Sequence, residues 1–403
     1  MNNPWRVALV SAVLLGLTVG LPYYAISFFY DYWETGFGWS RSAIMLGLPL
    51  GTLVTLALGP LYVRRLSPRH SITGGSVLVA ASLAGFGLMP PNILAYYGLW
   101  VLYMAGWTFA GPLAHQILLT ELFAEKRSSA LAVAYFGISL FGALSVATLA
   151  RPLTLAYGYQ TALLLLGGLI ALAVPLSYWG LPATEPDHNP KSTPAPVPRN
   201  RAFWLLLAGT TISIAGVGGI SQHLKLILRE ANYPTQSRLD AVFGVTVLIM
   251  LLTGSAGRFL FAWCVDRFPK RPILTAAFGL MAGSMPLLLV VEWAPDHLPY
   301  LFALIFGLGM SVDSLLLPIV AAEHFGSRSL APVLGIIVPV NVVGQTWFPS
   351  LLTLLWSITG NYTVPLLVTF AFILTGRFLL AAMPPPGAVR HPAAETSPAP
   401  ATR

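Results

Sequence analysis

The sequence predicts an all-α membrane protein of twelve transmembrane helices in two pseudo-symmetric six-helix bundles. Of its 403 residues, 56% are hydrophobic and only 9% are charged, whereas soluble domains carry roughly 25% charged residues. So few charges cannot build a water-facing surface, so lipid must cover most of the chain. A series of long apolar segments and an internal repeat give the number of helices and their division into halves.

The apolar segments are long enough to cross a bilayer, which needs about 20 mostly apolar residues. Candidates lie at about 7–30, 42–63, 71–90, 95–119, 130–150, 159–182, 203–227, 241–265, 272–291, 298–322, 330–356 and 363–383. A polar, proline-rich stretch separates the first six from the last six. We therefore predict an N-terminal bundle (1–183), a cytoplasmic linker (184–201), a C-terminal bundle (202–384) and a disordered cytoplasmic tail (385–403).

Lysine and arginine residues indicate the orientation, because cytoplasmic loops are enriched in them. With the N-terminus inside, fifteen fall on the cytoplasmic side: Arg6, Arg64, Arg65, Arg69, Lys126, Arg127, Lys191, Arg199, Arg201, Arg267, Lys270, Arg271, Arg328, Arg390 and Arg403. Five fall on the other side: Arg41, Arg151, Lys225, Arg229 and Arg238. We therefore expect both termini in the cytoplasm, and a bacterial inner (cytoplasmic) membrane as the location.

The two halves also repeat in sequence at one constant offset. A shift of 202 residues places Val63-Arg64-Arg65-Leu66 on Val265-Asp266-Arg267-Phe268 and Arg69 on Arg271. The same shift pairs Thr73 with Thr275, Phe123 with Phe325 and Gly142 with Gly344. Internal repeats are typical of transporters that alternate access to a site near the membrane midplane.

Composition and missing motifs exclude several other classes. The net charge of +8 is spread through short loops, without the basic run that nucleic-acid binding needs. Cys264 is the only cysteine, so neither an internal disulfide nor a cysteine-based metal cluster is possible. Phosphate-loop and His-Glu-x-x-His motifs are absent. We expect no enzyme activity, no cofactor, no metal and no nucleic-acid partner.

At the level of motifs, the chain resembles the major facilitator superfamily. The family's loop signature, Gly-x-Leu-x-Asp-Arg-x-x-x-Arg, is approximated by residues 262–271 (AWCVDRFPKR), while Arg64 stands in place of the acid in the first half. Three short segments are similar to the monocarboxylate and oxalate/formate branch: 37–42 (FGWSRS), 257–259 (GRF) and 359–362 (TGNY). The resemblance implies alternating access to a site lined by helices from both halves.

Arg258 and Asp313 are the main candidates for substrate binding. A charge at the bilayer centre costs roughly 2.5–3.5 kcal/mol, so it usually faces a cavity or a partner. Arg258 lies eight residues before Asp266, and Asp313 lies ten before Glu323. Both therefore sit about 12–15 Å from the cytoplasmic edge. The resemblance implies that their helices, the eighth and tenth, both face the pathway.

These two residues suggest a mechanism. Arg258 offers a planar fork of donors for a carboxylate, and small neighbours such as Gly254 should leave space beside it. Asp313 would neutralise Arg258 in the empty state and take up a proton when substrate replaces it. Animal monocarboxylate transporters carry an aspartate where this chain has Gly254, so Asp313 would have to supply the acid. The alternative is a permanent ion pair between two helices.

Other polar residues in the apolar segments are secondary candidates. For substrate binding these are Tyr23 and Tyr24 after Pro22, and Asn341 and Gln345, which share a helix face; packing or helix-joining roles are the alternatives. His115 and His223 are candidates for proton coupling, since histidine titrates near neutral pH. A satisfied structural histidine is the better interpretation of each.

The loop signature indicates a gate. In the superfamily its acid, here Asp266, meets the start of helix eleven, here near Ser329 and Leu330. A carboxylate at a helix N-terminus gains about 0.3–1 kcal/mol. With Arg64 replacing the first-half acid, we predict a one-sided gate of Asp266, Arg267 and Arg271. For the basic residues, a topology signal alone is the alternative.

The expected function is secondary active transport of a small organic anion resembling a monocarboxylate, coupled to protons. The partners would be the anion, protons and membrane lipid, and the chain would act as a monomer. A multidrug or hydrophobic-solute exporter of the same fold would bind cations or neutral compounds and would not need Arg258. A non-transporting membrane sensor or scaffold would show ligand-dependent stabilisation without flux.

Overall fold

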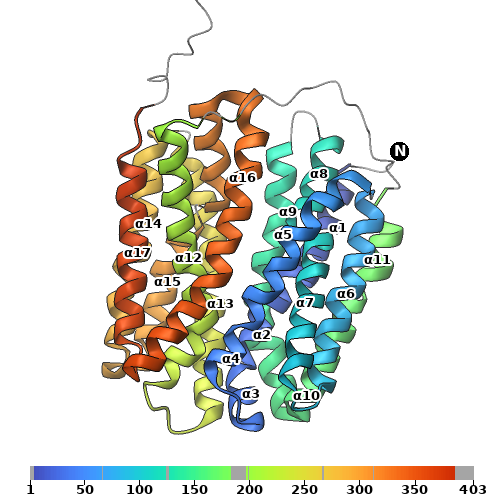
Figure 1. Ribbon diagram of the computed structural model, residues 1–403, viewed down its shortest axis with the longest axis vertical. Helices are drawn as coiled ribbons and strands as arrows, with labels where there is room; N and C mark the ends of the chain where they lie inside the picture. The colour runs from blue at the N-terminus through green and yellow to red at the C-terminus, as the bar shows by residue number, and fades with distance from the viewer. Residues whose placement is uncertain are drawn as a thin grey trace, which may run out of the picture.

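Two helical bundles lie side by side in the computed structural model (Figure 1). The structure describes residues 4–65, 67–123, 127–182, 197, 199–265, 267–311 and 313–385. Within these residues the regular elements are all helical. Each bundle buries apolar side chains between its own helices, and a shared apolar core continues between the two.

The N-terminal bundle is built from eleven α-helices and two π-helical stretches of the described chain. Their bounds are α1 Pro4–Leu15, η1 Gly16–Gly20, α2 Leu21–Phe28, α3 Tyr30–Phe37, α4 Arg41–Met45, α5 Gly47–Arg65, α6 Pro68–Leu88, α7 Ile93–Ala110, α8 Pro112–Leu122, α9 Arg127–Leu144, η2 Ser145–Ala150, α10 Arg151–Ala171 and α11 Ala173–Gly180. Several are consecutive pieces of one long bent helix, such as α1 to α3.

The C-terminal bundle has longer uninterrupted helices. They are α12 Arg201–Arg229, α13 Gln236–Val265, α14 Lys270–Leu289, the 3₁₀ turn η3 Val291–Trp293, α15 Leu298–Met310, α16 Asp313–Thr359 and α17 Thr363–Ala381. Element α16 is two helices joined at Gly326, whose φ of 75° breaks the helical path. Across the bundle boundary, α13 packs on α9, and α16 packs on α4 and α5.

Nine helices among the described residues are long and apolar enough to cross a membrane. One of these segments, Ser129–Gly180, has 52 residues and would be about 78 Å long as a single helix. Gly158, with φ 81°, divides it into two. Two shorter apolar helices, Arg41–Thr55 and Leu298–Met310, add to these. The all-α membrane fold is confirmed; the count of twelve crossings stays a prediction, since nine long helices alone do not establish it.

The internal repeat reappears in the turns between helices. Gly158 and Gly360 both adopt positive φ, 81° and 74°, and they are 202 residues apart, the offset found in the sequence. Each ends a long helix before the last helix of its half, a position that favours glycine because other residues rarely adopt positive φ. The two bundles therefore share this turn as well as sequence.

Side-chain caps explain where several helices begin. The oxygens of Ser40, Asn92 and Asn200 accept hydrogen bonds from the backbone N–H groups of Ala43 (3.2 Å), Leu94 (2.9 Å) and Phe203 (3.0 Å). These caps satisfy donors that the first helical turn leaves unpaired. They fix the starts of α4, α7 and α12, and α12 carries Gln222 and Lys225 of the sites described below.

Glycines allow α1 and η1 to approach α9 closely. A Cβ atom built on Gly137 would collide with the backbone carbonyl of Ala12, and one built on Gly20 would collide with that of Ile138. Small residues at such crossings let helix backbones pack tightly in membranes. This contact positions the first helix, and therefore Tyr23 and Tyr24, against the interface between the bundles.

Gly137→Ala is expected to lower the melting temperature in detergent, because the added methyl group can be accommodated only by moving a backbone. Overpacking of this kind costs about 1–3 kcal/mol. Gly98→Ala is the matched control, since nothing lies within 4 Å of the Cβ built there. Equal melting temperatures for the two variants would contradict this packing.

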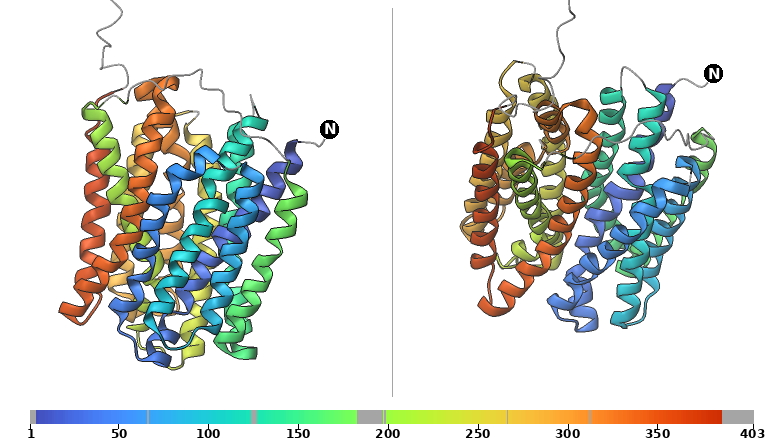
Figure 2. Two further views of the ribbon diagram at one scale, coloured as in Figure 1. Left: turned by 45° about the vertical axis from the view of Figure 1, so that its right-hand side comes forward. Right: turned by 45° about the horizontal axis from the view of Figure 1, so that its top comes forward.

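Both bundles begin at the same end of the molecule, and the last helix also ends there (Figure 1). Figures 1 and 2 show the starts of α1 and α12 and the end of α17 at one end, which we call the inner end. The opposite end, which we call the outer end, carries α3, α4 and the loop 230–235. The predicted tail and most of the predicted linker lie outside the described residues.

Candidate functional site

Arg258 joins the two bundles. Its Nη1 donates a 2.7 Å hydrogen bond to the hydroxyl of Ser139 on α9, a side chain that is buried. The half-buried guanidinium therefore lies at the boundary where the bundles meet. The space expected at Gly254 is filled by α15, since a Cβ there would lie 3.3 Å from the carbonyl oxygen of Gly307.

Polar side chains from both bundles continue from Arg258 along this boundary. The hydroxyl of Tyr24 lies within electrostatic range of the guanidinium, and the ring of Tyr24 packs edge-on against that of Tyr23 at 5.1 Å. The buried Tyr23 hydroxyl lies beside the amides of Gln222 and Gln345, without a hydrogen bond of normal geometry among the described residues. We call Tyr23, Tyr24, Ser139, Gln222, Arg258 and Gln345 the central polar cluster.

Gln222 was not among the residues singled out from the sequence. It is buried on α12, and its Oε1 accepts a 2.7 Å hydrogen bond from the Tyr30 hydroxyl of the other bundle. Because the amide oxygen accepts from Tyr30, the Gln222 side chain has its N–H groups left to donate, and it lies beside the Tyr23 hydroxyl. The boundary therefore carries a cation at Arg258 and neutral donors farther toward the outer end.

Asn341 occupies a different position from Gln345, although both lie on α16. Its Oδ1 accepts hydrogen bonds from the hydroxyls of Thr211 (2.6 Å) and Thr210 (3.3 Å) on α12. These bonds join two helices of the same bundle. A substrate role for Asn341 stays a prediction, and its contacts here are those of a helix link.

The two histidines lie in different surroundings. His115 on α8 is fully buried, and neither ring nitrogen has a hydrogen bond of normal geometry among the described residues. His223 on α12 is also fully buried, with Nε2 2.8 Å from the carbonyl oxygen of Pro349 and Nδ1 2.7 Å from the Tyr362 hydroxyl. Since a carbonyl only accepts, Nε2 carries the proton and Nδ1 accepts from Tyr362. His223 thereby links α12, α16 and the start of α17 as a neutral ring.

Tyr362→Phe is expected to destabilise the protein by about 1–3 kcal/mol, because it leaves the buried Nδ1 of His223 without its donor. The measurement is thermal unfolding in detergent. Tyr157→Phe is the control, since the Tyr157 side chain is 63% exposed on α10. A Tyr362→Phe protein that melts with the parent would show that the hydrogen bond does not stabilise the fold.

A buried ionic network closes the outer end between the two bundles. Lys225 on α12 contacts the carboxylates of Asp31 on α3 and Asp240 on α13, at 2.8 Å each. All three side chains are at least 97% buried. The apolar segments predict Lys225 as one of the loop charges and Asp313 as the one acid deep in the membrane. The structure adds two buried acids, which we call with Lys225 the outer triad.

A second layer of charges lies around the outer triad. Glu34 contacts Arg229 at 2.9 Å and Arg41 at 3.5 Å. The guanidinium of Arg41 stacks on the Trp356 ring at 3.8 Å, and its Nη1 donates to the Tyr362 hydroxyl at 3.4 Å. Helices α3 and α4 of one bundle are thus held against α12, α16 and α17 of the other.

Comparison with known proteins identifies the family of this fold. Residues 13–349 match the family model described as Major Facilitator Superfamily. The chain belongs to the major facilitator superfamily. It is similar to Monocarboxylate transporter 13 of Bos taurus, with 27% identity over 84% of this chain and 77% of that protein. It is also similar to Monocarboxylate transporter 11 of Homo sapiens, with 25% identity over 81% and 71% of the two chains. The protein is therefore a multi-pass membrane transporter of this superfamily.

The superfamily's loop signature lies at the inner end, where part of it falls outside the described residues. This holds for Asp266 and for the side chain of Asp313, whose backbone begins α16. Arg267 is exposed, donates to the carbonyl oxygen of Trp263 at 3.2 Å and lies over its ring. Arg271 is half-buried near the start of α14. The gate and the role of Asp313 stay predictions.

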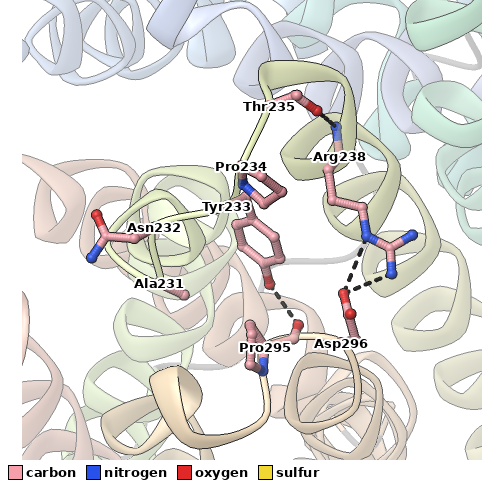
Figure 3. A pocket seen from close by; sticks show the side chains of 8 residues that line it. All are labelled: Ala231, Asn232, Tyr233, Pro234, Thr235, Arg238, Pro295 and Asp296. Atoms are coloured by element: carbon pink, nitrogen blue, oxygen red, sulfur yellow. Dashed lines mark hydrogen bonds and ion pairs between the residues drawn. The ribbon is translucent and has the colours of Figure 1, made fainter.

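A surface pocket of about 310 Å³ lies at the outer end, apart from the central polar cluster. It is lined by Ala231, Asn232, Tyr233, Pro234, Thr235, Arg238, Pro295 and Asp296 (Figure 3). Tyr233 donates to the carbonyl oxygen of Pro295 at 2.6 Å, and Arg238 pairs with Asp296 at 2.8 Å. Burial raises the pKa of Tyr233, so the phenol stays a donor. The pocket joins loops of one bundle and contains none of the predicted site residues.

Proposed function

We propose that this transporter carries a small organic anion of the monocarboxylate class by alternating access, with Arg258 as the residue that binds the carboxylate. The observation that carries the proposal is the hydrogen bond from Arg258 on α13 to Ser139 on α9. A cation shared by both bundles lies where alternating access must expose the substrate first to one side and then to the other. An arginine at such depth is costly unless it serves a partner or a ligand.

The donors around Arg258 support an anion rather than a cation as substrate. A guanidinium presents up to five N–H donors, and two of them suit one carboxylate. Tyr23, Gln222 and Gln345 add neutral donors farther along the boundary. The names of the relatives, monocarboxylate transporters of cattle and humans, agree with this chemistry.

Proton coupling is part of the proposal. Substrate binding to Arg258 would release the carboxylate that balances it, and that carboxylate would take up a proton as its counter-charge leaves. Asp313 is the proposed proton carrier, with His115 as a second candidate. We further propose that the chain acts as a monomer in the cytoplasmic membrane, with both termini in the cytoplasm.

The test is uptake by proteoliposomes containing the purified full-length chain. Labelled monocarboxylates, a dicarboxylate and a lipophilic cation are compared with and without an inward proton gradient. We expect uptake of at least one monocarboxylate, stimulated by the gradient, and no uptake of the cation. Cation transport would favour a multidrug exporter, and ligand-dependent stabilisation without any flux would favour a sensor; either result would overturn the proposal.

A further inference from the structure

The ammonium of Lys225 in the outer triad already binds carboxylates. Its three protons are directed to the carbonyl oxygen of Phe28 at 2.7 Å and to one oxygen each of Asp31 and Asp240 at 2.8 Å. The rings of Phe28 and Tyr32 also lie within 4.6 Å of Nζ. Every donor of the ammonium is used, so the site is built for a buried cation with two carboxylate ligands.

The remaining carboxylate oxygens are satisfied as acceptors. Oδ2 of Asp31 accepts from the Gln236 amide at 2.6 Å, and Oδ2 of Asp240 accepts from the Tyr32 hydroxyl at 2.6 Å. Both carboxylates are therefore bonded as anions. The outer triad carries one cation and two anions, one carboxylate more than neutrality requires.

The three residues divide unequally between the bundles. Lys225 and Asp240 lie on α12 and α13 of the C-terminal bundle, whereas Asp31 lies on α3 of the other bundle. Parting of the bundles at the outer end would leave Lys225 paired with Asp240 and remove Asp31 together with the carbonyl oxygen of Phe28 on α2. That movement frees one carboxylate position on a buried ammonium, facing the newly opened side.

We propose that Lys225 is a second anion site, which receives the carboxylate of an incoming monocarboxylate when the outer end opens, and that Asp31 is its tethered competitor. Exchange of one carboxylate for another keeps the ammonium paired with two anions, so opening avoids an unsatisfied charge. Closing reverses the exchange: Asp31 returns, and the substrate is released inward. This inference deepens the proposed function by adding an entry site for the same class of substrate.

The position of Lys225 suits an entry site. Gln222 of the central polar cluster lies three residues earlier on α12, hence one helical turn inward on a neighbouring face. Along α13, Asp240 and Arg258 are eighteen residues apart, or about 27 Å. The outer triad is therefore a separate site from Arg258, and Gln222 lies between the two.

Alkylation of a single cysteine tests the proposal. Ser221 lies four residues before Lys225 and is 3% exposed, so it shares the face of Lys225 and is shielded while the outer end is closed. Ser221→Cys is introduced with Cys264→Ser, which removes the only native cysteine. An impermeant maleimide is applied to the outer face of oriented vesicles, with propionate or its neutral analogue propionamide.

We expect propionate to accelerate alkylation roughly three- to tenfold, because it stabilises the open outer end, and propionamide to have no effect. Arg258→Ala should keep this response. Asp31→Asn should raise the rate without propionate and lower the concentration needed for the full response. The double variant Asp31→Asn/Lys225→Gln, which removes one charge of each sign, should label at a rate independent of propionate.

Two results would overturn the entry site. One is an unresponsive parent protein, and the other is a response lost in Arg258→Ala but kept in the double variant. Neither depends on whether Arg258 is required for flux. A response that depends on Lys225, found together with full transport by Arg258→Ala, would support this inference while rejecting the proposed role of Arg258.

Discussion

Arg258→Ala is expected to lower kcat/KM for monocarboxylate uptake by about 10- to 100-fold. A hydrogen bond to a charged group is worth roughly 1.5–3 kcal/mol, and each 1.4 kcal/mol changes a rate or affinity tenfold. Alanine removes the fork of donors and leaves the Ser139 hydroxyl without its bond across the boundary. The measurement is initial uptake rate in proteoliposomes at several substrate concentrations, so that kcat and KM are separated.

Two controls separate anion binding from structure. Ser139→Ala removes the same hydrogen bond but keeps the guanidinium, so it should lose far less activity. Arg377→Gln changes another half-buried arginine, one that lies against Gly279 between α14 and α17, and should transport like the parent. Equal losses in Arg258→Ala and Ser139→Ala would mean that Arg258 only holds α13 to α9.

Lys225→Met is expected to shift the protein toward conformations in which the outer end is open. The substitution leaves Asp31 and Asp240 buried without their cation. Breaking a buried pair in this way costs about 3–5 kcal/mol, which changes a conformational equilibrium by roughly 10²-fold to several 10³-fold. Opening of the outer end hydrates both carboxylates and so removes this free-energy cost.

Distances between spin labels measure this opening. Labels at Tyr157→Cys on α10 and Thr235→Cys before α13, with Cys264→Ser, report the separation of the bundles at the outer end. The distance should lengthen in Lys225→Met and stay unchanged in Arg238→Met. Arg238 and Asp296 form an ion pair on the surface, where both side chains are about half exposed. Surface pairs of this kind contribute about 0–1 kcal/mol to stability. An unchanged distance in Lys225→Met would show that the outer triad does not hold the end shut.

The fold was predictable because the bilayer imposes strong rules on a sequence. Apolar length and the positive-inside bias report directly on helices that cross lipid. The 202-residue offset predicted a repeated construction, and Gly158 and Gly360 now show it in the backbone. Helix ends were harder, since polar helices extend beyond the lipid. The segment assigned to 7–30 continues through α3 to Phe37.

That extension explains why the outer triad escaped sequence reasoning. Asp31 seemed to follow the first helix, and Lys225 lies within one turn of the expected end of its helix, so both resembled solvated loop charges. Only the packing of α3 against α12 and α13 brings them together with Asp240. The signal available in the sequence was a lysine and two acids, each near the same end of its helix. Arg258, in contrast, was predictable because it is the single charged residue in the apolar segment 241–265.

The most direct test of the proposed role of Arg258 is a structure of the protein determined with a bound monocarboxylate at saturating concentration. We expect carboxylate density beside the guanidinium of Arg258, with oxygens about 2.7–2.9 Å from its nitrogens and with Ser139 or Tyr24 in contact with the ligand. An anion bound elsewhere, for example beside Arg238 in the loop pocket, with Arg258 still bonded to Ser139 and no ligand near it, would contradict it.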